Sequence, residues 1–188
     1  STVPVSVHLD HAESTDLCRE AVELGFTSIM YDGSKLPDAQ NRETTAEITA
    51  FAHEHGVSVE AELGEVGGKN GVHDPSARTN PEDAAQFVAD TGVDLLAVAV
   101  GSSHAMATRE AVLDNQLIAA IHELVPVPLV LHGSSGVPDE GMVAAIQAGM
   151  TKINVSTHLN VVFTQGVRQI LDENPKIVDP RKYVGPAT

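Results

Sequence analysis

Short apolar runs alternate with helix-like stretches along the whole chain, and this alternation limits the possible folds more than any other feature. The runs are rich in Val, Ile and Leu, and most are bounded by Gly, Asp or Pro, as buried strands tend to be. Six such strand–helix units predict an α/β fold with a parallel sheet and right-handed crossovers. The predicted strands cover residues 3–9, 27–31, 57–63, 93–100, 128–131 and 151–155.

Helix signals stand between the predicted strands. Residues 15–24 place several apolar side chains on one face, which is typical of a helix packed on a sheet. Pro81 is followed by Glu82 and Asp83, and a proline with acidic residues in the first turn indicates a helix start. The segment PDE at 138–140 repeats this signal. Each predicted helix therefore connects two predicted strands.

Polar residues directly follow the predicted strands, and their placement favours a barrel. An open doubly wound sheet spreads its strand ends along a line, whereas a β/α barrel gathers them on one face. A complete TIM (β/α)8 barrel has eight units and roughly 250 residues. We therefore interpret residues 1–188 as a single β/α-barrel catalytic domain that holds the third to eighth units, with the first two strands and the terminal helix outside the chain. The polar strand-end residues are Asp10, His11, Asp32, Glu62, His104, His132, Gly133 and Asn154.

Charge and cysteine content exclude several classes of partner. The chain has 11 basic and 26 acidic residues, a net charge of −15, which disfavours a nucleic-acid backbone or an anionic membrane surface. No apolar run approaches the roughly 20 residues of a membrane span. The single cysteine, Cys18, excludes an intrachain disulfide and suits a reducing compartment. We therefore expect a cytoplasmic protein with no nucleic-acid or membrane partner.

Three of the nine histidines stand at predicted strand ends in glycine- or serine-rich surroundings: His11, His104 and His132. Three neutral imidazoles that leave one position open are the usual ligands of a catalytic zinc. One such histidine alone is more often a core or capping residue. The shared placement of three makes a metal site a serious alternative.

Acidic residues accompany these histidines. Asp10 precedes His11 and is either a general base, an orienting partner of the imidazole, or a helix N-cap. Ser14 is the better candidate for the cap, because helical residues follow it directly. Asp32 and Glu62 end apolar strands, where an unpaired charge is costly. They either pair with Lys or Arg or contribute to a second cation site.

Two turns of small residues follow the last two predicted strands, at 132–136 and 154–157. Such turns present backbone N–H groups and the positive end of a helix to an anion. In barrels, the loops after the seventh and eighth strands often bind phosphate. The pairing predicts a local phosphate site in an otherwise acidic protein.

Seven short segments carry a family resemblance. In chain order they are HLDH (8–11), MYDGS (30–34), VEAELG (59–64), GSSH (101–104), LHGSSG (131–136), KINVST (152–157) and DPRKY (179–183). Together, over nearly the whole chain, they resemble the class II, metal-dependent fructose-bisphosphate aldolases, a family that includes tagatose-bisphosphate aldolases. The resemblance implies a homodimer or a dimer-based tetramer that acts on a phosphorylated sugar.

The resemblance also implies a role for each matching residue. Three histidines would hold the catalytic Zn²⁺, and Asp10 would be the acid/base at the breaking bond. Asp32 and Glu62 would hold a second divalent cation, and backbone groups around Ser103 would hold a monovalent cation. Arg181 would reach the far phosphate from a neighbouring subunit. The zinc ligands would be His11, His104 and His132, and the substrate site would include Ala105, Gly133, Ser134, Ser135, Asn154, Val155, Ser156 and Thr157.

Residues 64–80 form the longest irregular stretch, which is typical of a binding loop. The family usually has an acidic residue in this loop to move the carbon-bound proton, but this chain has Asn70, which cannot do so. His73 and Asp74 are the nearest titratable candidates, with His73 preferred because its ordinary pKa is closest to neutrality.

The implied reaction is the reversible cleavage of a ketose 1,6-bisphosphate, fructose or tagatose, into dihydroxyacetone phosphate and glyceraldehyde 3-phosphate through a zinc-stabilised enediolate. One alternative is a zinc-dependent hydrolase on the same barrel, which would activate water instead. A second is a catalytically impaired relative that acts as an assembly subunit. The substituted loop at Asn70 gives this second alternative some weight.

Overall fold

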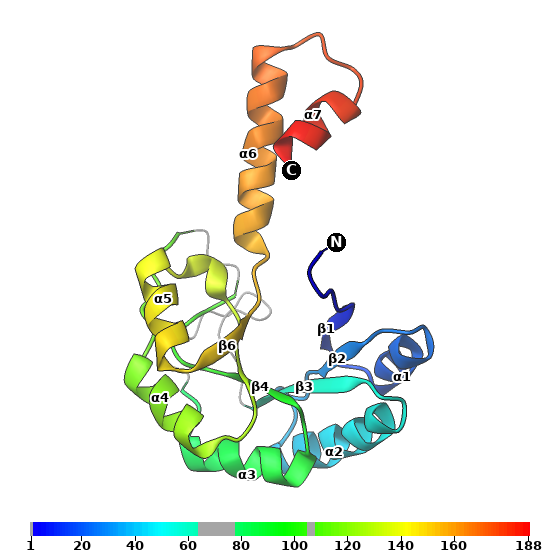
Figure 1. The fold of residues 1–188 in the computed structure, drawn as a ribbon, viewed down its shortest axis with the longest axis vertical. Coiled ribbons are helices and arrows are strands. Elements are labelled where there is room, and N and C mark those ends of the chain that lie inside the picture. Colours follow the sequence, from blue (N-terminus) through cyan, green and yellow to red (C-terminus); the bar gives the residue numbers. More distant parts are fainter. Residues whose placement is uncertain (1, 64–77, 105–107) are drawn as a thin grey trace.

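The computed structural model describes residues 2–63, 78–104 and 108–188. Within these ranges, six parallel strands pair in chain order, and the sheet curves into a half-barrel (Figure 1). The α/β prediction and the partial TIM barrel are therefore confirmed. The strands are β1 (His8–Ala12), β2 (Ser28–Tyr31), β3 (Ser58–Leu63), β4 (Leu95–Val98), β5 (Leu129–Leu131) and β6 (Met150–Ile153).

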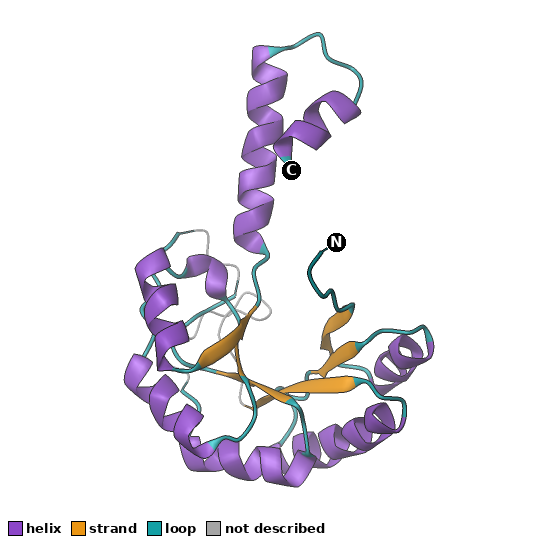
Figure 2. Cartoon of the chain, in the orientation of Figure 1, coloured by secondary structure: helices purple, strands orange, loops and turns teal. Residues whose placement is uncertain are grey.

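In the part of the chain that the structure describes, five helices cover the convex side of the sheet (Figure 2). Their starts follow local chemistry: the side chains of Ser14, Asn80 and Asp114 each accept a hydrogen bond from a backbone N–H in the first turn of α1, α3 and α4. Ser14, as expected, caps α1. The helices are α1 (Thr15–Glu23), α2 (Asp38–Glu54), α3 (Pro81–Thr91), α4 (Asn115–Leu124) and α5 (Asp139–Ala148).

Alternation along the strands divides the sheet into two faces. One set of side chains packs under the helices in the main core, for example Ile29, Leu96 and Leu131. The intervening residues point to the concave side, where Met30, Ala97 and Val130 form a second, smaller cluster. The concave side is therefore the inside of the barrel, and the polar residues that share its register line the same space.

The first strand begins later than the sequence pattern predicts. The apolar pattern assigns residues 3–9 to it, but β1 starts at His8, and the valines before it are exposed, with Val5 at 75%. The register of β1 on β2, with His8 beside Ser28, places the polar segment HLDHA next to a buried strand instead. Apolar composition alone does not show which residues have a strand neighbour. Asp10 and His11 consequently lie inside a strand rather than after one.

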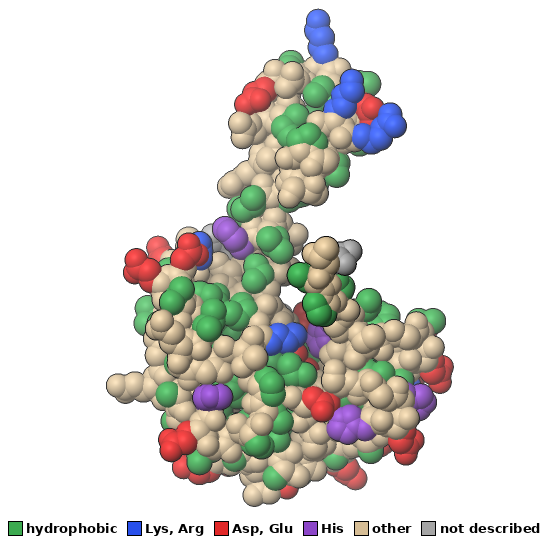
Figure 3. Space-filling model, viewed as in Figure 1, with side chains coloured by type: hydrophobic (Ala, Val, Ile, Leu, Met, Phe, Trp, Pro, Cys, Tyr) green, Lys and Arg blue, Asp and Glu red, His purple; other side chains and the backbone are tan. Residues whose placement is uncertain are grey.

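The last helices form an arm that projects from the half-barrel (Figure 1). After β6, α6 (Thr157–Glu173) leaves the sheet and packs against α7 (Arg181–Ala187), and no residue of either helix is buried. Figure 3 shows Lys and Arg side chains gathered at the far end of this arm, whereas Asp and Glu side chains lie mainly over the half-barrel. None of the helices in the described ranges combines the length and apolar character that crossing a membrane requires.

Candidate active site

A pocket of about 470 Å³ opens beside the carboxyl ends of the strands, on the concave side of the sheet. Side chains from β1 and the segments after β4, β5 and β6 converge on it. The pocket contains all three predicted zinc ligands, Asp10 and the described part of the predicted phosphate site. Its lining residues are His8, Asp10, His11, His104, His132, Gly133, Ser134, Ser135, Lys152, Asn154, Val155, Ser156 and Thr157.

A bulge in β1 allows Asp10 and His11, which are consecutive, to face the same pocket. The register of β1 on β2 shifts between Leu9 and Ala12. His11 has a φ of 49°, the left-handed conformation that residues other than glycine rarely adopt. A regular strand would have sent the two side chains to opposite faces. The strained backbone therefore serves to bring the carboxylate and the imidazole together.

At Gly133 the loop after β5 lies in close contact with the loop after β4. Its φ is 67°, and a Cβ at this position would lie 2.6 Å from the carbonyl carbon and oxygen of Ser103. Only glycine allows this close approach without displacing the Ser103 backbone. Because Ser103 precedes His104 and Gly133 follows His132, the contact also brings these two histidines near each other.

The three histidines meet as a group that could hold a metal ion, with their candidate ligand nitrogens within 4.8 Å of one another. The His11 and His132 rings are T-shaped, with centroids 4.5 Å apart, and His11 Nε2 lies 2.8 Å from His132 Nδ1. The His104 ring lies 5.1 Å from that of His11 and 5.7 Å from that of His132, measured between centroids. The predicted triad is thus brought together by the fold.

Two carboxylates fix the orientation of two of these rings. His11 Nδ1 lies 2.7 Å from Asp32 Oδ2, and His132 Nε2 lies 2.9 Å from Glu60 Oε1. An ionised carboxylate only accepts hydrogen bonds, so each ring donates from that nitrogen and turns the lone pair of its other nitrogen inward. Those inward nitrogens face each other at 2.8 Å. Two lone pairs at this distance require a proton or a cation between them, so the donor set fits a metal.

Asp32 and Glu62 lie behind His11, and both side chains are buried. They form a second group with His11 whose ligand atoms also lie within 4.8 Å of one another. Asp32 Oδ1 accepts hydrogen bonds from the backbone N–H and hydroxyl of Ser34, so both of its oxygens are engaged. The geometry gives Asp32 a clear role in holding the His11 ring. A second cation at this group stays a prediction.

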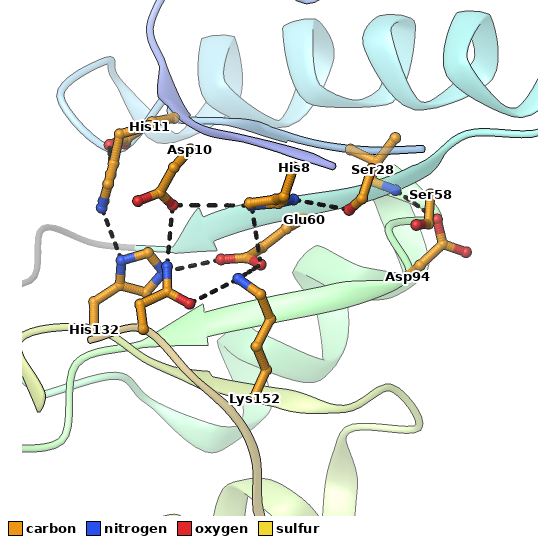
Figure 4. Close-up of polar contacts among 12 residues, drawn as sticks. His8, Asp10, His11, Ser28, Ser58, Glu60, Asp94, His132 and Lys152 are labelled. Carbon is orange, nitrogen blue, oxygen red and sulfur yellow. Dashed lines mark hydrogen bonds and ion pairs between the residues drawn. The ribbon is translucent and has the colours of Figure 1, made fainter. Parts of the chain in front are cut away.

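A chain of polar contacts joins His132, one of the three clustered histidines, to Asp10 (Figure 4). Lys152 Nζ lies 2.7 Å from Glu60 Oε2 and 2.8 Å from Asn154 Oδ1. Asn154 Nδ2 in turn donates to Asp10 Oδ1 at 3.0 Å. Burial of Glu60 opposes its ionisation, but the hydrogen bond from His132 and the charge of Lys152 outweigh it and hold the pKa of Glu60 below its usual value.

His8 adds a further imidazole to this region. Its Nδ1 lies 2.8 Å from Ser28 Oγ, and its Nε2 lies 3.8 Å from carboxylate oxygens of both Asp10 and Glu60. Burial, together with the positive charge of Lys152, lowers the pKa of His8 below 6.5 despite the two carboxylates. The lowered pKa favours the neutral form of the His8 imidazole.

Sequence reasoning misses three residues of this network: His8, Glu60 and Lys152. Each stands two positions before a residue that is predicted, namely Asp10, Glu62 and Asn154. Because residues two apart in a strand share a face, the alternation could have revealed them. The prediction covers only residues at strand ends, and so overlooks polar side chains one layer deeper in the barrel.

The residues that we predict to bind phosphate lie together at the other side of the pocket. The Ser134 hydroxyl donates to the backbone carbonyl of Asn154, which ties the turn after β5 to the segment after β6. Ser135 Oγ accepts a hydrogen bond from the backbone N–H of His158 in the first turn of α6. The Ser156 side chain makes no capping hydrogen bond at the N-terminus of α6. The positive end of this helix thus borders the pocket, as an anion site needs.

Other predicted residues lie elsewhere or outside the described ranges. Arg181 is on the projecting arm, where its guanidinium pairs with Asp179 and is 89% exposed, so this chain does not place it at its own pocket. Its role from a neighbouring subunit stays a prediction. Ala105, Asn70 and the two loop candidates for proton transfer, His73 and Asp74, lie outside the described residues.

Comparison with known proteins finds fructose-bisphosphate aldolases in each case. The model of the family "Fructose-bisphosphate aldolase class-II" matches residues 1–188. A fructose-bisphosphate aldolase from Geobacillus stearothermophilus is 43% identical over 187 residues, which are 98% of this chain and 65% of that protein. One from Staphylococcus aureus is 43% identical over 188 residues, 99% of this chain and 66% of the relative. The chain thus spans just under two thirds of the length of these relatives.

Solved structures that resemble this chain are also aldolases. The YdjI aldolase from Escherichia coli K12 superimposes with a TM-score of 0.79 at 35% identity, covering 99% of this chain and 64% of that one. A fructose-bisphosphate aldolase from Campylobacter jejuni gives a TM-score of 0.75 at 26% identity, covering 92% and 56% of the two chains. With the family model matched from end to end, the chain belongs to the class-II fructose-bisphosphate aldolase family.

Proposed function

We propose that this chain forms the catalytic face of an aldolase that reversibly cleaves a ketose 1,6-bisphosphate, fructose or tagatose, into dihydroxyacetone phosphate and glyceraldehyde 3-phosphate. One observation carries the proposal. Three imidazoles, a carboxylate and a turn suited to phosphate line one pocket, and two of the imidazoles point lone pairs at the same point, 2.8 Å apart. This combination suits a metal-assisted reaction of a phosphorylated substrate.

His11, His104 and His132 would hold the cation, which we propose to be Zn²⁺ because three neutral imidazoles are its usual catalytic ligands. When bound, it supplies Lewis-acid stabilisation of negative charge on the substrate oxygens. Asp32 and Glu60 keep two of these imidazoles in the tautomer that binds a cation.

Asp10 is the proposed acid/base. Its side chain is 51% exposed and lines the pocket, and one of its oxygens is held by Asn154. In the cleavage direction Asp10 accepts the proton of the C4 hydroxyl as the bond between C3 and C4 breaks. It returns this proton to the aldehyde oxygen in synthesis. The turns at Gly133–Ser135 and Asn154–Thr157 bind one phosphate through backbone N–H groups and so orient the reacting carbons.

A Schiff-base route through Lys152 fits this site poorly. Its Nζ is held by hydrogen bonds to Glu60 and Asn154, and a lysine that attacks a carbonyl would have to give up both contacts. The charge on Lys152 therefore serves other side chains. Metal-dependent cleavage is the better proposal for the same pocket.

We further propose that the enzyme is a homodimer or a dimer-based tetramer. Large apolar side chains are exposed along the arm, including Leu159 at 59% and Val162 at 50%. Arg181 on the same arm lies away from its own pocket, as a residue that serves a neighbouring subunit would. A second copy of the chain would cover this apolar surface. The cytoplasmic location stays a prediction.

A coupled triose-phosphate assay tests the function. Fructose 1,6-bisphosphate and tagatose 1,6-bisphosphate are each supplied, with and without a chelator, and release of triose phosphate is followed. We expect cleavage of at least one of the two, loss of cleavage with the chelator and recovery on addition of Zn²⁺. Covalent trapping of substrate by borohydride would contradict the metal-dependent mechanism. Release of inorganic phosphate without triose phosphate would instead indicate a hydrolase.

A further inference from the structure

The ion pair between Glu60 and Lys152 lies between the three histidines and Asp10, and beyond the contact of Glu60 with His132 the proposed reaction gives the pair no role. We propose that these two are positioning residues that hold His132 in its metal-binding tautomer and Asn154 in the amide orientation that supports Asp10. The inference rests on the proposed function, because it assigns a task to residues of the same site.

The pair occupies a layer of the barrel interior that it shares with His8 and with apolar side chains. Glu60 is paired in register with Met30 on one side and Leu95 on the other, and Lys152 is beside Val130. The Glu60 side chain is fully buried, and that of Lys152 is 29% exposed. Well-packed apolar side chains in place of a buried ion pair often leave stability unchanged or increase it. Stability alone therefore gives little reason for the pair.

On the metal side, Glu60 decides which nitrogen of His132 carries the proton. Glu60 Oε1 lies 2.9 Å from His132 Nε2, so this nitrogen donates and Nδ1 keeps its lone pair. Nδ1 is the nitrogen that faces His11. Lys152 binds the other oxygen of Glu60 at 2.7 Å and favours the ionised carboxylate that this arrangement needs.

On the acid/base side, Lys152 decides how the amide of Asn154 is turned. An ammonium group can only donate, so the atom of Asn154 that it contacts at 2.8 Å must be the carbonyl oxygen. The amide nitrogen is then directed at Asp10 Oδ1, 3.0 Å away. Without the ammonium group the amide could turn over and present its oxygen to a carboxylate. The same ion pair thus orders both sides of the pocket (Figure 4).

The first test is the substitution Glu60→Gln. Lys152 would attract the new carbonyl oxygen, and the amide nitrogen would then face His132 Nε2 and move the ring proton to Nδ1. We expect Zn²⁺ affinity, measured by competition with a chromophoric chelator, to fall roughly 10- to 100-fold, the usual effect of losing a partner of a metal-bound histidine. Histidine ¹⁵N spectra should show the proton leaving Nε2 of His132. Glu47→Gln, at an exposed ion pair with Arg19, is the matched control.

The second test separates positioning from a structural role. The double variant Glu60→Met with Lys152→Met replaces the pair by apolar side chains and leaves no unpaired buried charge. If the pair serves only the fold, this variant should bind Zn²⁺ like the wild type. We expect a fold of wild-type stability with Zn²⁺ affinity still reduced roughly 10- to 100-fold. Wild-type affinity in the double variant would overturn the inference.

The third test addresses Asn154. Lys152→Met keeps the hydrogen bond between Glu60 and His132, so we expect a smaller loss of Zn²⁺ affinity than in Glu60→Gln. With metal loaded, kcat should fall more than tenfold because Asp10 loses its oriented donor. Lys35→Met, at an exposed pair with Glu13, is the control. An unchanged kcat in Lys152→Met would contradict the role at Asn154. Absence of aldol cleavage in the wild type would overturn the proposed function alone, because the affinity ratios are measured without substrate.

Discussion

At the scale of single residues, Cys18 shows how burial controls reactivity. Its side chain is fully buried on α1, and this burial raises the pKa of the thiol to about 11, only partly opposed by the charge of Arg19. At pH 7 roughly one molecule in 10⁴ then carries the thiolate, which is the reactive form. We expect iodoacetamide to leave the native protein unmodified and to alkylate Cys18 once the chain is unfolded in urea, as followed by mass spectrometry. Rapid labelling of the native protein would show that α1 opens readily.

Substitution of Asp10 tests its role as the acid/base separately from metal binding. Its substitution by alanine should leave Zn²⁺ bound and reduce kcat by roughly 10²–10⁴, the usual contribution of one general acid or base. His132→Ala should instead lose the metal itself. Metal content by atomic absorption and steady-state kinetics distinguish the two results.

The control for Asp10 is Ser14→Ala, because Ser14 is the residue that caps α1. This variant should lose about 1 kcal/mol of unfolding free energy and keep its kcat. If Asp10→Ala retains full turnover, Asp10 is not the acid/base.

At the scale of elements, the turn after β5 depends on a glycine that chain geometry requires. Gly133→Ala must adopt a left-handed φ, which costs about 1 kcal/mol, and must also push away the Ser103 backbone. Gly56 has nearly the same φ, 70°, but a Cβ there meets nothing within 4 Å. We therefore expect Gly133→Ala to lose roughly 1–3 kcal/mol more unfolding free energy than Gly56→Ala, and to bind Zn²⁺ more weakly. Urea unfolding and chelator competition measure both effects, and equal losses would contradict the close approach.

How far the sequence predicts these elements depends on what each pattern encodes. The apolar runs predict β2 to β5 correctly, because short continuous runs bounded by turn residues are typical of strands buried on both faces. The predicted start of β1 is wrong because Val3 and Val5 have the composition of a strand but are exposed and precede the strand, which begins at His8. The bulge at His11 has no signal in residue type, because a positive φ at histidine is set by tertiary contacts. Strand-end histidines are therefore predictable, whereas the geometry that joins Asp10 to His11 is not.

At the scale of the whole molecule, the projecting arm makes the assembly testable. Leu159 and Val162 lie three residues apart on α6 and are both exposed, so a double substitution to aspartate should leave the fold intact and disrupt the proposed contact with a second copy. We expect sedimentation velocity to show monomers for this variant and dimers or tetramers for the wild type. Val112→Asp, at a residue 82% exposed outside the arm, is the control and should keep the wild-type assembly. A wild-type monomer would contradict the proposal.

The half-barrel and its site are predictable at this scale, because the carboxyl ends of parallel strands lie on one side of the sheet even where the exact strand bounds are wrong. The position of the arm is not, because α6 carries apolar residues whose pattern resembles that of a helix packed on a sheet. Only the fold shows that these residues face outward. Arg181 illustrates the same limit, since its distance from the pocket depends on where the arm points.

The contact between His11 and His132 joins residues 121 positions apart, across strands that are not neighbours in the sheet. An unfolded chain has no comparable arrangement, so a cation at this point binds the native state almost exclusively. A cation held there would link β1 to the turn after β5 across the open side of the curved sheet. By mass action, free Zn²⁺ at 100 times its dissociation constant should add about 2.7 kcal/mol to the unfolding free energy. Calorimetric melting at increasing Zn²⁺ would measure this gain, and metal depletion would make the half-barrel easier to unfold long before any substrate is present.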